Sequence, residues 1–212
     1  MRSMPLKIKV CGMKYCDNIQ EVVQLPIDYL GFIFYEKSSR YVGDMNLSDC
    51  DIPLHIAKTG VFVNETVERM NACIEKYRLD AVQLHGSEKP DLCREMRKSG
   101  VQIIKVFSIK GKEDLALCEH YSDVCDYFLF DTKTSKHGGS GVKFDWDILL
   151  HYRGKTPFFL SGGIGAEDAE YIRSFAHPAC YGVDVNSRFE TQLALKNIAL
   201  LKQFIQTLKS EL

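Results

Sequence analysis

The sequence predicts a (β/α)8 barrel of the TIM-barrel type, formed by residues 1–212 as a single domain. Three observations predict it: a length of 212 residues, eight short apolar runs rich in strand-forming residues, and helical spacing in the intervals between these runs. A chain of this length fits one domain with a sizeable core. Strands that alternate with helices form one parallel sheet by the right-handed crossover rule. Because none of the eight runs has the character of an edge strand, we expect the sheet to close into a barrel.

The eight predicted strands start at intervals of 21 to 31 residues. They are expected at residues 6–11, 29–35, 57–63, 80–84, 101–107, 126–131, 157–161 and 180–185. Helical spacing of apolar residues in the intervals is clearest at 65–77, 88–99 and 192–210. The last helix is long and apolar enough either to cover the barrel or to meet a second subunit, so the sequence predicts a monomer or a homodimer without choosing between them.

Two long polar loops follow predicted strands, at residues 37–46 and 132–141. Both contain glycine, and both come after a strand, on the side where a barrel carries its active site. Loops of this length at that position are more often lids than spacers. We therefore expect both loops to act as lids over the site.

The composition excludes several function classes. The net charge is −1, with 26% charged and 45% hydrophobic residues, so there is no long-range attraction toward nucleic acid or an anionic membrane. The N-terminus carries charges where a signal peptide would be apolar, and no apolar run reaches the length of a membrane span. We therefore expect a cytoplasmic protein that binds neither nucleic acid nor membranes.

Eight cysteines are spread through hydrophobic segments of the chain. No C-x-x-C pair occurs, and the nearest pair, Cys11 and Cys16, has neither a matching second pair nor a histidine cluster. Such spacing does not suit a zinc site, and a chain of this length needs no disulfide framework. The sequence therefore predicts reduced thiols and no metal.

Polar residues end several of the predicted strands. Successive side chains of a strand point to opposite faces, so Ile8 and Val10 face the helices, whereas Lys9 and Cys11 face the barrel axis. One polar residue at a strand end can simply open a loop. Several on one face of a closed barrel predict an active site, because barrel enzymes build theirs at that rim. The same alternation turns these further residues inward at or near strand ends: His85, Asp131, Ser161, Gly182 and Asp184.

Cys11 and Asp131 are the predicted proton-transfer pair. They end the first and sixth strands, on opposite sides of an eight-membered ring, so they can flank a bound ligand. Lys9, two residues before Cys11, favours the thiolate because a nearby cation lowers the pKa of a thiol. The alternatives are that Cys11 is a small buried apolar residue and that Asp131 caps the following turn.

The last two strands lead into loops that suit a phosphate. Residues 158–170 and 181–191 each run from a strand through a turn into a predicted helix. Glycines let backbone amides approach a phosphate, a helix N-terminus adds N–H groups, and phosphate sites after strands seven and eight are frequent in these barrels. The alternative is that the glycines only form tight turns. The candidate phosphate ligands are Gly162, Gly163, Asn186 and Ser187.

Taken together, these segments resemble the phosphoribosylanthranilate isomerase family of tryptophan biosynthesis. Each stretch alone is a weak signal, but together they follow the family's order and spacing along the whole chain. The matching stretches are KVCGMK (9–14), LGFIFYEKSSRYV (30–42), TGVFVNE (59–65), AVQLHGSE (81–88), IKVF (104–107), FLFDTK (128–133), HGGSGVKFDW (137–146), FFLSGGI (158–164) and GVDVNSRFE (182–190).

The resemblance implies a reaction and two catalytic roles. The reaction is an Amadori rearrangement of a small-molecule phosphosugar, N-(5'-phosphoribosyl)anthranilate, to 1-(2-carboxyphenylamino)-1-deoxyribulose 5-phosphate, without metal or cofactor. Cys11 corresponds to the family's general base, and Asp131 corresponds to its general acid. A positioned acid and base suffice because the substrate nitrogen itself withdraws the electrons.

The resemblance also implies substrate-binding roles. Arg40 corresponds to an arginine proposed to pair with the anthranilate carboxylate, which a guanidinium binds through two parallel hydrogen bonds. Asp184 corresponds to an aspartate that lines the sugar site. Gln83 and His85 correspond to the rim, where His85 is as suited to positioning as to proton transfer.

The chain departs from the family pattern at two places. Ser39 replaces the usual proline before Arg40, which removes a rigid φ constraint from that loop. Residues 193–197, LALKN, stand where the family commonly has P-G-x-K-D. Phe34 and Phe107 are candidates to wall the aromatic ring of the substrate, but filling of the apolar core is the favoured role for both.

Two other function classes remain open from the sequence. A different phosphate-binding barrel enzyme, such as an epimerase, would need metal ligands inside the barrel, and the sequence offers one inward histidine at a strand end. A non-catalytic phosphate-binding barrel would not need the Cys11 and Asp131 pair.

Overall fold

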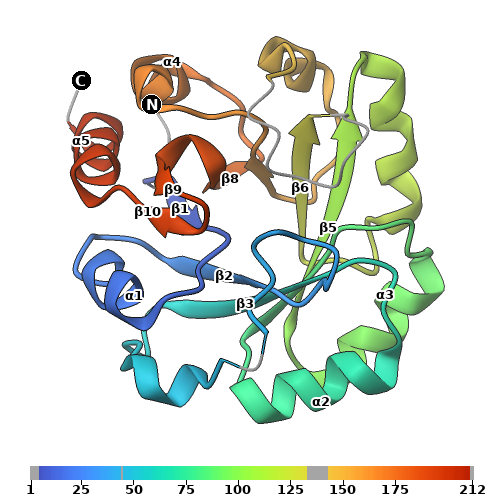
Figure 1. Cartoon of the computed structure of the whole chain (residues 1–212). Helices are drawn as coiled ribbons and strands as arrows, with labels where there is room; N and C mark the ends of the chain where they lie inside the picture. Colours follow the sequence, from blue (N-terminus) through green and yellow to red (C-terminus); the bar gives the residue numbers. More distant parts are fainter. Residues whose placement is uncertain (1–4, 44, 133–142, 211–212) are drawn as a thin grey trace.

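The chain forms a closed barrel of eight parallel strands, in which each strand pairs with the next one in sequence and the eighth pairs with the first (Figure 1). The structure is a computed structural model and describes residues 5–43, 45–132 and 143–210. The prediction of a (β/α)8 barrel is confirmed, and every predicted strand overlaps an observed one. The strands are β1 (Lys7–Val10), β2 (Tyr29–Ile33), β3 (Ala57–Phe62), β4 (Ala81–Leu84), β5 (Gln102–Ile109), β6 (Tyr127–Thr132), β7 (Phe158–Leu160) and β8 (Cys180–Val185).

Helices surround the barrel in the intervals between strands (Figure 1). The predicted helices at 65–77 and 88–99 are present. The α-helices are α1 (Cys16–Val22), α2 (Val67–Tyr77), α3 (Pro90–Met96), α4 (Ala169–Ser174) and α5 (Ile198–Lys209). The 3₁₀ helices are η1 (Leu47–Cys50), η2 (Arg97–Ser99), η3 (Lys112–Tyr121), η4 (Trp146–His151), η5 (Ala166–Asp168) and η6 (Ser187–Phe189). Of the lid loop predicted at 132–141, only Thr132 lies within the described residues.

Side-chain caps and a proline determine where several helices begin. The Thr66 hydroxyl accepts a hydrogen bond of 3.2 Å from the Arg69 N–H at the start of α2. The Asn197 side chain accepts one of 3.1 Å from the Leu200 N–H at the start of α5. Both contacts satisfy N–H groups that the first helical turn leaves unpaired. Pro90 begins α3, where its missing N–H costs nothing.

Buried residues form two layers, one on each face of the strands. The outer layer contains Phe128 and Phe130 together with residues of the surrounding helices. Leu129 belongs to the inner layer, so the alternation predicted for 126–131 is confirmed. Tyr181 also packs against the inner layer, because the pairing of β7 with β8 is irregular at this point. The buried inner layer consists of Tyr29, Ala81, Ile104, Val106, Leu129 and Phe159.

The last helix begins six residues later than the predicted segment 192–210. Residues before it form a two-stranded antiparallel hairpin of β9 (Glu190–Gln192) and β10 (Leu195–Lys196). Ala194 connects the strands with φ 62°, a left-handed conformation that no α-helix contains. Helix α5 then packs beside α4 (Figure 1) and buries Leu201, Phe204, Ile205 and Leu208.

The expectation that all eight cysteines are reduced is wrong for one pair. Cys16 and Cys50 form a disulfide with their Cα atoms 4.9 Å apart, which joins the first residue of α1 to the last residue of η1. The other six cysteines are reduced thiols. The two partners are separated by 34 positions, and only the packing of α1 against η1 brings them together.

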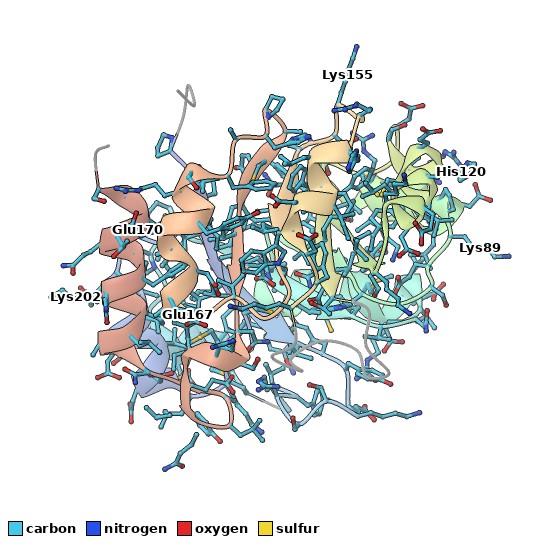
Figure 2. All side chains as sticks on the ribbon, turned by 90° about the horizontal axis from the view of Figure 1, so that it is seen from above. Lys89, His120, Lys155, Glu167, Glu170 and Lys202 are labelled. Carbon is cyan, nitrogen blue, oxygen red and sulfur yellow. A yellow bond between two sulfur atoms is a disulfide. The ribbon has the colours of Figure 1, made fainter. Side chains whose placement is uncertain are left out.

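Charged residues gather on the outside of the molecule. Lys89, Lys155 and Lys202 are exposed and point away from the barrel in Figure 2. None of the helices in the described ranges combines the length and the apolar character that a bilayer crossing requires.

Candidate active site

A pocket of about 760 Å³, measured with the open space at its mouth, lies at the carboxyl ends of the barrel strands. Ten residues to which the sequence analysis gave catalytic, substrate-binding or phosphate-binding roles line this one pocket. They are Cys11, Arg40, Gln83, His85, Asp131, Gly162, Gly163, Asp184, Asn186 and Ser187.

Cys11 follows β1 and lies deep in the pocket, with 4% of its surface exposed. Its backbone N–H donates to the Val185 carbonyl at 2.9 Å, which ties the residue to β8. The backbone of Gly31 packs against the thiol so closely that a Cβ atom there would stand 2.6 Å from Sγ. The thiol is therefore held in a fixed position on the pocket floor.

The predicted effect of Lys9 on the thiol is outweighed. Lys9 is fully buried, its Nζ donates to Asp184 Oδ1 at 2.8 Å, and its charge acts on the nearby Cys11 thiol. Burial raises the pKa of Cys11 above its usual value, and Asp184 adds to this, while Lys9 lowers it by less. Lys9 does lower the pKa of the thiol, as predicted, but burial outweighs this effect, so the neutral thiol is favoured.

Asp131 ends β6 and faces His85 across the pocket. Its Oδ1 accepts a hydrogen bond of 2.8 Å from the Thr132 N–H, and its Oδ2 lies 3.5 Å from His85 Nε2. On its other side, His85 Nδ1 lies 3.4 Å from Gln83 Nε2. The carboxyl, the imidazole and the amide thus form a row along the rim. In this arrangement the Asp131 carboxyl group can donate a proton to a ligand, and His85 can orient it.

Two further polar side chains are buried in the pocket wall. The Oε1 atom of Gln83 is buried and has no hydrogen-bond partner among the residues that the structure describes. A buried acceptor without a partner costs free energy, about 1–3 kcal/mol, so a ligand hydroxyl or N–H would bind favourably there. Asp184 is held by Lys9 and by Ser161, whose Oγ lies 3.5 Å from Asp184 Oδ2.

Gly162 and Gly163 form the turn after β7. Both adopt left-handed conformations, with φ of 88° and 69°, which a residue with a side chain rarely adopts. A Cβ atom at Gly162 would also collide with Thr132. Asn186 and Ser187 come from the turn after β8 and line the same pocket. The four candidate phosphate ligands therefore lie on neighbouring loops, as predicted.

Arg40 belongs to the loop after β2, and sequence reasoning missed the two residues that hold it. Its Nε and Nη2 donate to the two carboxylate oxygens of Glu190 at 2.8 and 2.7 Å. Lys196 donates to the same carboxylate at 2.7 Å. The signal that could have revealed Lys196 was its place in LALKN, where it aligns with the lysine of the family's P-G-x-K-D segment. The sequence analysis assigned LALKN to a helix.

Phe34 and Phe107 do not line the pocket. Phe34 is buried and stacks on Phe62 with ring centroids 5.2 Å apart. Phe107 packs edge-on against Phe128 at 5.0 Å. Core filling, the favoured role of both residues, is therefore confirmed. Apolar pocket walls come instead from Ile33, Val61, Val63 and Ile164.

A closed eight-stranded barrel with a pocket of ionisable and polar side chains at the carboxyl ends of its strands defines the class of protein: a (β/α)8-barrel enzyme.

Comparison with known proteins identifies the family. Residues 8–207 match the N-(5'phosphoribosyl)anthranilate (PRA) isomerase family. The chain belongs to this family, and it is therefore an isomerase of the kind that interconverts an aldose and a ketose.

Individual relatives agree with this assignment. N-(5'-phosphoribosyl)anthranilate isomerase of Parabacteroides distasonis is 49% identical over 203 residues, which cover 94% of this chain and 91% of the relative. The crystal structure of the Thermotoga maritima enzyme has a TM-score of 0.85 and 31% identity, covering 96% of this chain and 98% of that one. A crystal structure of a phosphoribosyl anthranilate isomerase in complex with reduced 1-(o-carboxyphenylamino)-1-deoxyribulose 5-phosphate has a TM-score of 0.81 and 29% identity, covering 96% of this chain and 98% of that one.

Proposed function

We propose that the protein converts N-(5'-phosphoribosyl)anthranilate to 1-(2-carboxyphenylamino)-1-deoxyribulose 5-phosphate in tryptophan biosynthesis. One observation carries the proposal: in a barrel of this family, all ten residues selected for the reaction line a single pocket. The pocket contains a thiol and a carboxyl group that suit proton transfer on the sugar. It also contains an arginine that suits the aromatic carboxylate and a glycine-rich turn that suits the phosphate.

Asp131 is the proposed general acid. Ring opening of the ribose requires a proton on the ring oxygen as the C1–O bond breaks. The electron pair of the anthranilate nitrogen then forms the C1=N bond of an iminium ion. Asp131 Oδ2 lies beside His85, which can orient the carboxyl group or return a proton to it. Such a positioned acid typically contributes about 10²–10⁴ to the rate.

Cys11 is the proposed general base. The iminium ion makes the C2 hydrogen acidic, and a thiolate at Cys11 can remove it. The electrons of the C2–H bond form a C1=C2 double bond, and those of the C1=N bond return to the nitrogen. The resulting enol becomes the ketone of the product when C1 gains a proton and the C2 hydroxyl group loses one. The burial of Cys11 also excludes water, which would otherwise compete for the iminium ion.

The other pocket residues are proposed to hold the substrate. Arg40 would pair with the carboxylate of the anthranilate ring. Gly162, Gly163 and the 186–187 turn would bind the phosphate through backbone and side-chain groups. Gln83, with its unpartnered Oε1, and Asp184 would contact the ribose.

The test is an assay of purified protein with phosphoribosylanthranilate in the presence of EDTA. Activity under these conditions would support a reaction without metal, and no turnover at any pH would refute the proposed function. We predict that Cys11→Ala and Asp131→Asn each reduce kcat by at least about a hundredfold, the range of a general acid or base. Asp131→Asn with full activity would remove Asp131 from the mechanism. Complementation of a tryptophan auxotroph lacking this isomerase is the matching test in cells.

The cellular setting is part of the proposal. A biosynthetic isomerase with a small-molecule substrate fits a cytoplasmic monomer or homodimer that needs neither nucleic acid nor a membrane. The Cys16–Cys50 disulfide is unusual in a reducing compartment. Thiol titration of protein quenched with alkylating agent in intact cells would show whether this bond exists there, and light scattering would give the subunit number.

A further inference from the structure

Arg40 is held by a carboxylate that lies behind it. Glu190 accepts from Arg40 Nε and Nη2 in a two-bond fork of 2.8 and 2.7 Å. The side chains of Arg40 and Glu190 are only 12% and 6% exposed. Arg40 lines the pocket, whereas Glu190 is absent from its lining. Because the guanidinium is planar, pairing through Nε and Nη2 leaves the edge formed by Nη1 and Nη2 directed away from Glu190.

Lys196 compensates the charge of Glu190. Its buried Nζ donates to Glu190 Oε1 at 2.7 Å, to Asn186 Oδ1 at 2.7 Å and to the Asn186 carbonyl at 3.4 Å. Burial lowers the pKa of Lys196, and Glu190 opposes this shift. All three contacts are acceptors, which suits the three N–H groups of an ammonium ion. Burial likewise disfavours charge on Glu190, but Arg40 and Lys196 outweigh it and keep the pKa of Glu190 below its usual value.

The sum of these charges matters for an anionic ligand. An Arg40–Glu190 pair alone would be neutral, and its attraction for a carboxylate would be weak. With Lys196 the three groups carry one net positive charge, which a substrate carboxylate can neutralise in a site where charges are poorly screened. Neutral side chains at Glu190 and at Lys196 would therefore disturb recognition in two different ways. A neutral residue at Glu190 would no longer fix the orientation of Arg40, and a neutral residue at Lys196 would remove the net positive charge.

The backbone around the three residues is closely constrained. Glu190 and Lys196 are paired in the β9–β10 hairpin. The Asn18 side chain accepts from the Lys196 N–H at 2.7 Å and donates to the Lys196 carbonyl at 3.0 Å, which anchors the hairpin on α1. A Cβ atom at Gly12 would stand 2.8 Å from Arg40 Cδ, so Arg40 passes directly over the residue that follows Cys11.

We propose that Glu190 and Lys196 are positioning residues that make Arg40 the selector for a carboxylate on the aromatic ring of the substrate. This inference rests on the proposed function, because it presupposes an anthranilate group beside Arg40. It adds that selection depends on three side chains, those of Arg40, Glu190 and Lys196, of which Glu190 and Lys196 do not contact the ligand.

The test compares two substrates: N-(5'-phosphoribosyl)anthranilate and N-(5'-phosphoribosyl)aniline, which lacks the carboxylate. We expect Glu190→Gln and Lys196→Met each to reduce kcat/KM for the carboxylated substrate about tenfold to a hundredfold, mainly through KM, as for a lost charged hydrogen bond. For the aniline substrate the change in Glu190→Gln should stay within about threefold, because it has no carboxylate for Arg40 to bind. Lys196→Met also removes the contacts to Asn186 in the proposed phosphate site, so for this variant the loss should be larger for the carboxylated substrate than for the aniline substrate. Glu190→Asp, which retains the charge, should restore part of the preference.

Glu170→Gln is the matched control. Glu170 forms an exposed ion pair with Arg173 on α4, and it lies on the outer surface in Figure 2. This variant should change neither substrate's kinetics. Equal losses for both substrates in Glu190→Gln, or unchanged kinetics for both, would overturn the inference. If wild-type protein converts neither substrate, the proposed function fails instead. Should Glu190→Gln not fold, Lys196→Met and Glu190→Asp still decide the question.

Discussion

The two ends of the barrel interior differ in the side chains that fill them: aromatic rings at one end and ionisable groups at the other. At the amino ends of the strands, the inside is filled by aromatic rings: Tyr29 and Phe159 meet edge-on at 5.4 Å, Tyr181 packs against both, and Tyr127 packs against Phe159 and Tyr181. The tyrosine hydroxyls satisfy one another, with 3.1 Å between those of Tyr29 and Tyr181. At the carboxyl ends, the same inward positions carry Lys9, Asp184 and other ionisable groups, and one buried acceptor has no partner in the described residues.

This difference separates stability from function within one barrel. The aromatic end gains free energy from buried area and ring packing. The polar end buries charges, which contribute little net stability even when paired, but it leaves donors and acceptors for a ligand. We therefore expect substitutions at the aromatic end to lower the free energy of unfolding, and substitutions at the polar end to lower activity.

The largest expected effect on stability is that of Phe159→Ala. Phe159 is completely buried, and its removal leaves a cavity inside the barrel. We expect a loss of about 3–5 kcal/mol in the free energy of unfolding, measured by urea denaturation. Asp131→Asn, at the polar end, should change it by less than about 1 kcal/mol. Similar losses for the two variants would contradict the division between the ends.

An intermediate effect is expected from pH. The raised pKa of Cys11 means that the thiolate is a minor form at neutral pH, and that its fraction rises about tenfold per pH unit until the pH reaches that pKa. Alkylation of Cys11 by iodoacetamide, followed by mass spectrometry of its peptide, should therefore accelerate up to and beyond pH 9. A half-maximal alkylation rate below pH 8 would show that Lys9 lowers the pKa of Cys11 by more than burial raises it.

The same shift has a consequence for stability. A folded-state pKa above the unfolded one contributes stability below the unfolded pKa, and this contribution is lost as the pH rises through the folded pKa. Between pH 8 and 10, the free energy of unfolding of Cys11→Ala should therefore decrease by less than that of the wild-type protein.

The smallest effect is expected from Tyr29→Phe. This variant removes the hydroxyl that contacts Tyr181 and, at 3.4 Å, Gln102 Oε1, while the ring remains. The loss of one net hydrogen bond corresponds to about 1 kcal/mol in the free energy of unfolding. Because the aromatic end does not line the pocket, kcat and KM should stay unchanged. A change in KM larger than threefold would show that the two ends are coupled.

Much of the fold and the site was accessible from the sequence because it depends on local periodicity. A run of apolar residues defines a strand, and alternation along it assigns each side chain to one face. Cys11 and Asp131 could be placed on the rim in this way, and the Gly162–Gly163 turn by its composition. The helix predicted from 192 failed at its start because Ala194 adopts a left-handed conformation that its side chain gives no reason to expect.

The sequence by itself predicted the barrel, the order of its strands and the rim positions of Cys11, His85, Asp131 and Asp184, since these follow from patterns of residues close together in the chain. The resemblance to a family added Arg40 and Gln83. Only the tertiary structure decided which charges compensate one another. Arg40 and Glu190 are 150 positions apart, and the Cys16–Cys50 bond and the environment of Cys11 likewise join distant segments. The pKa of a buried group and the orientation of a guanidinium depend on distances through space and on the exclusion of water, and both exist only once the chain is folded.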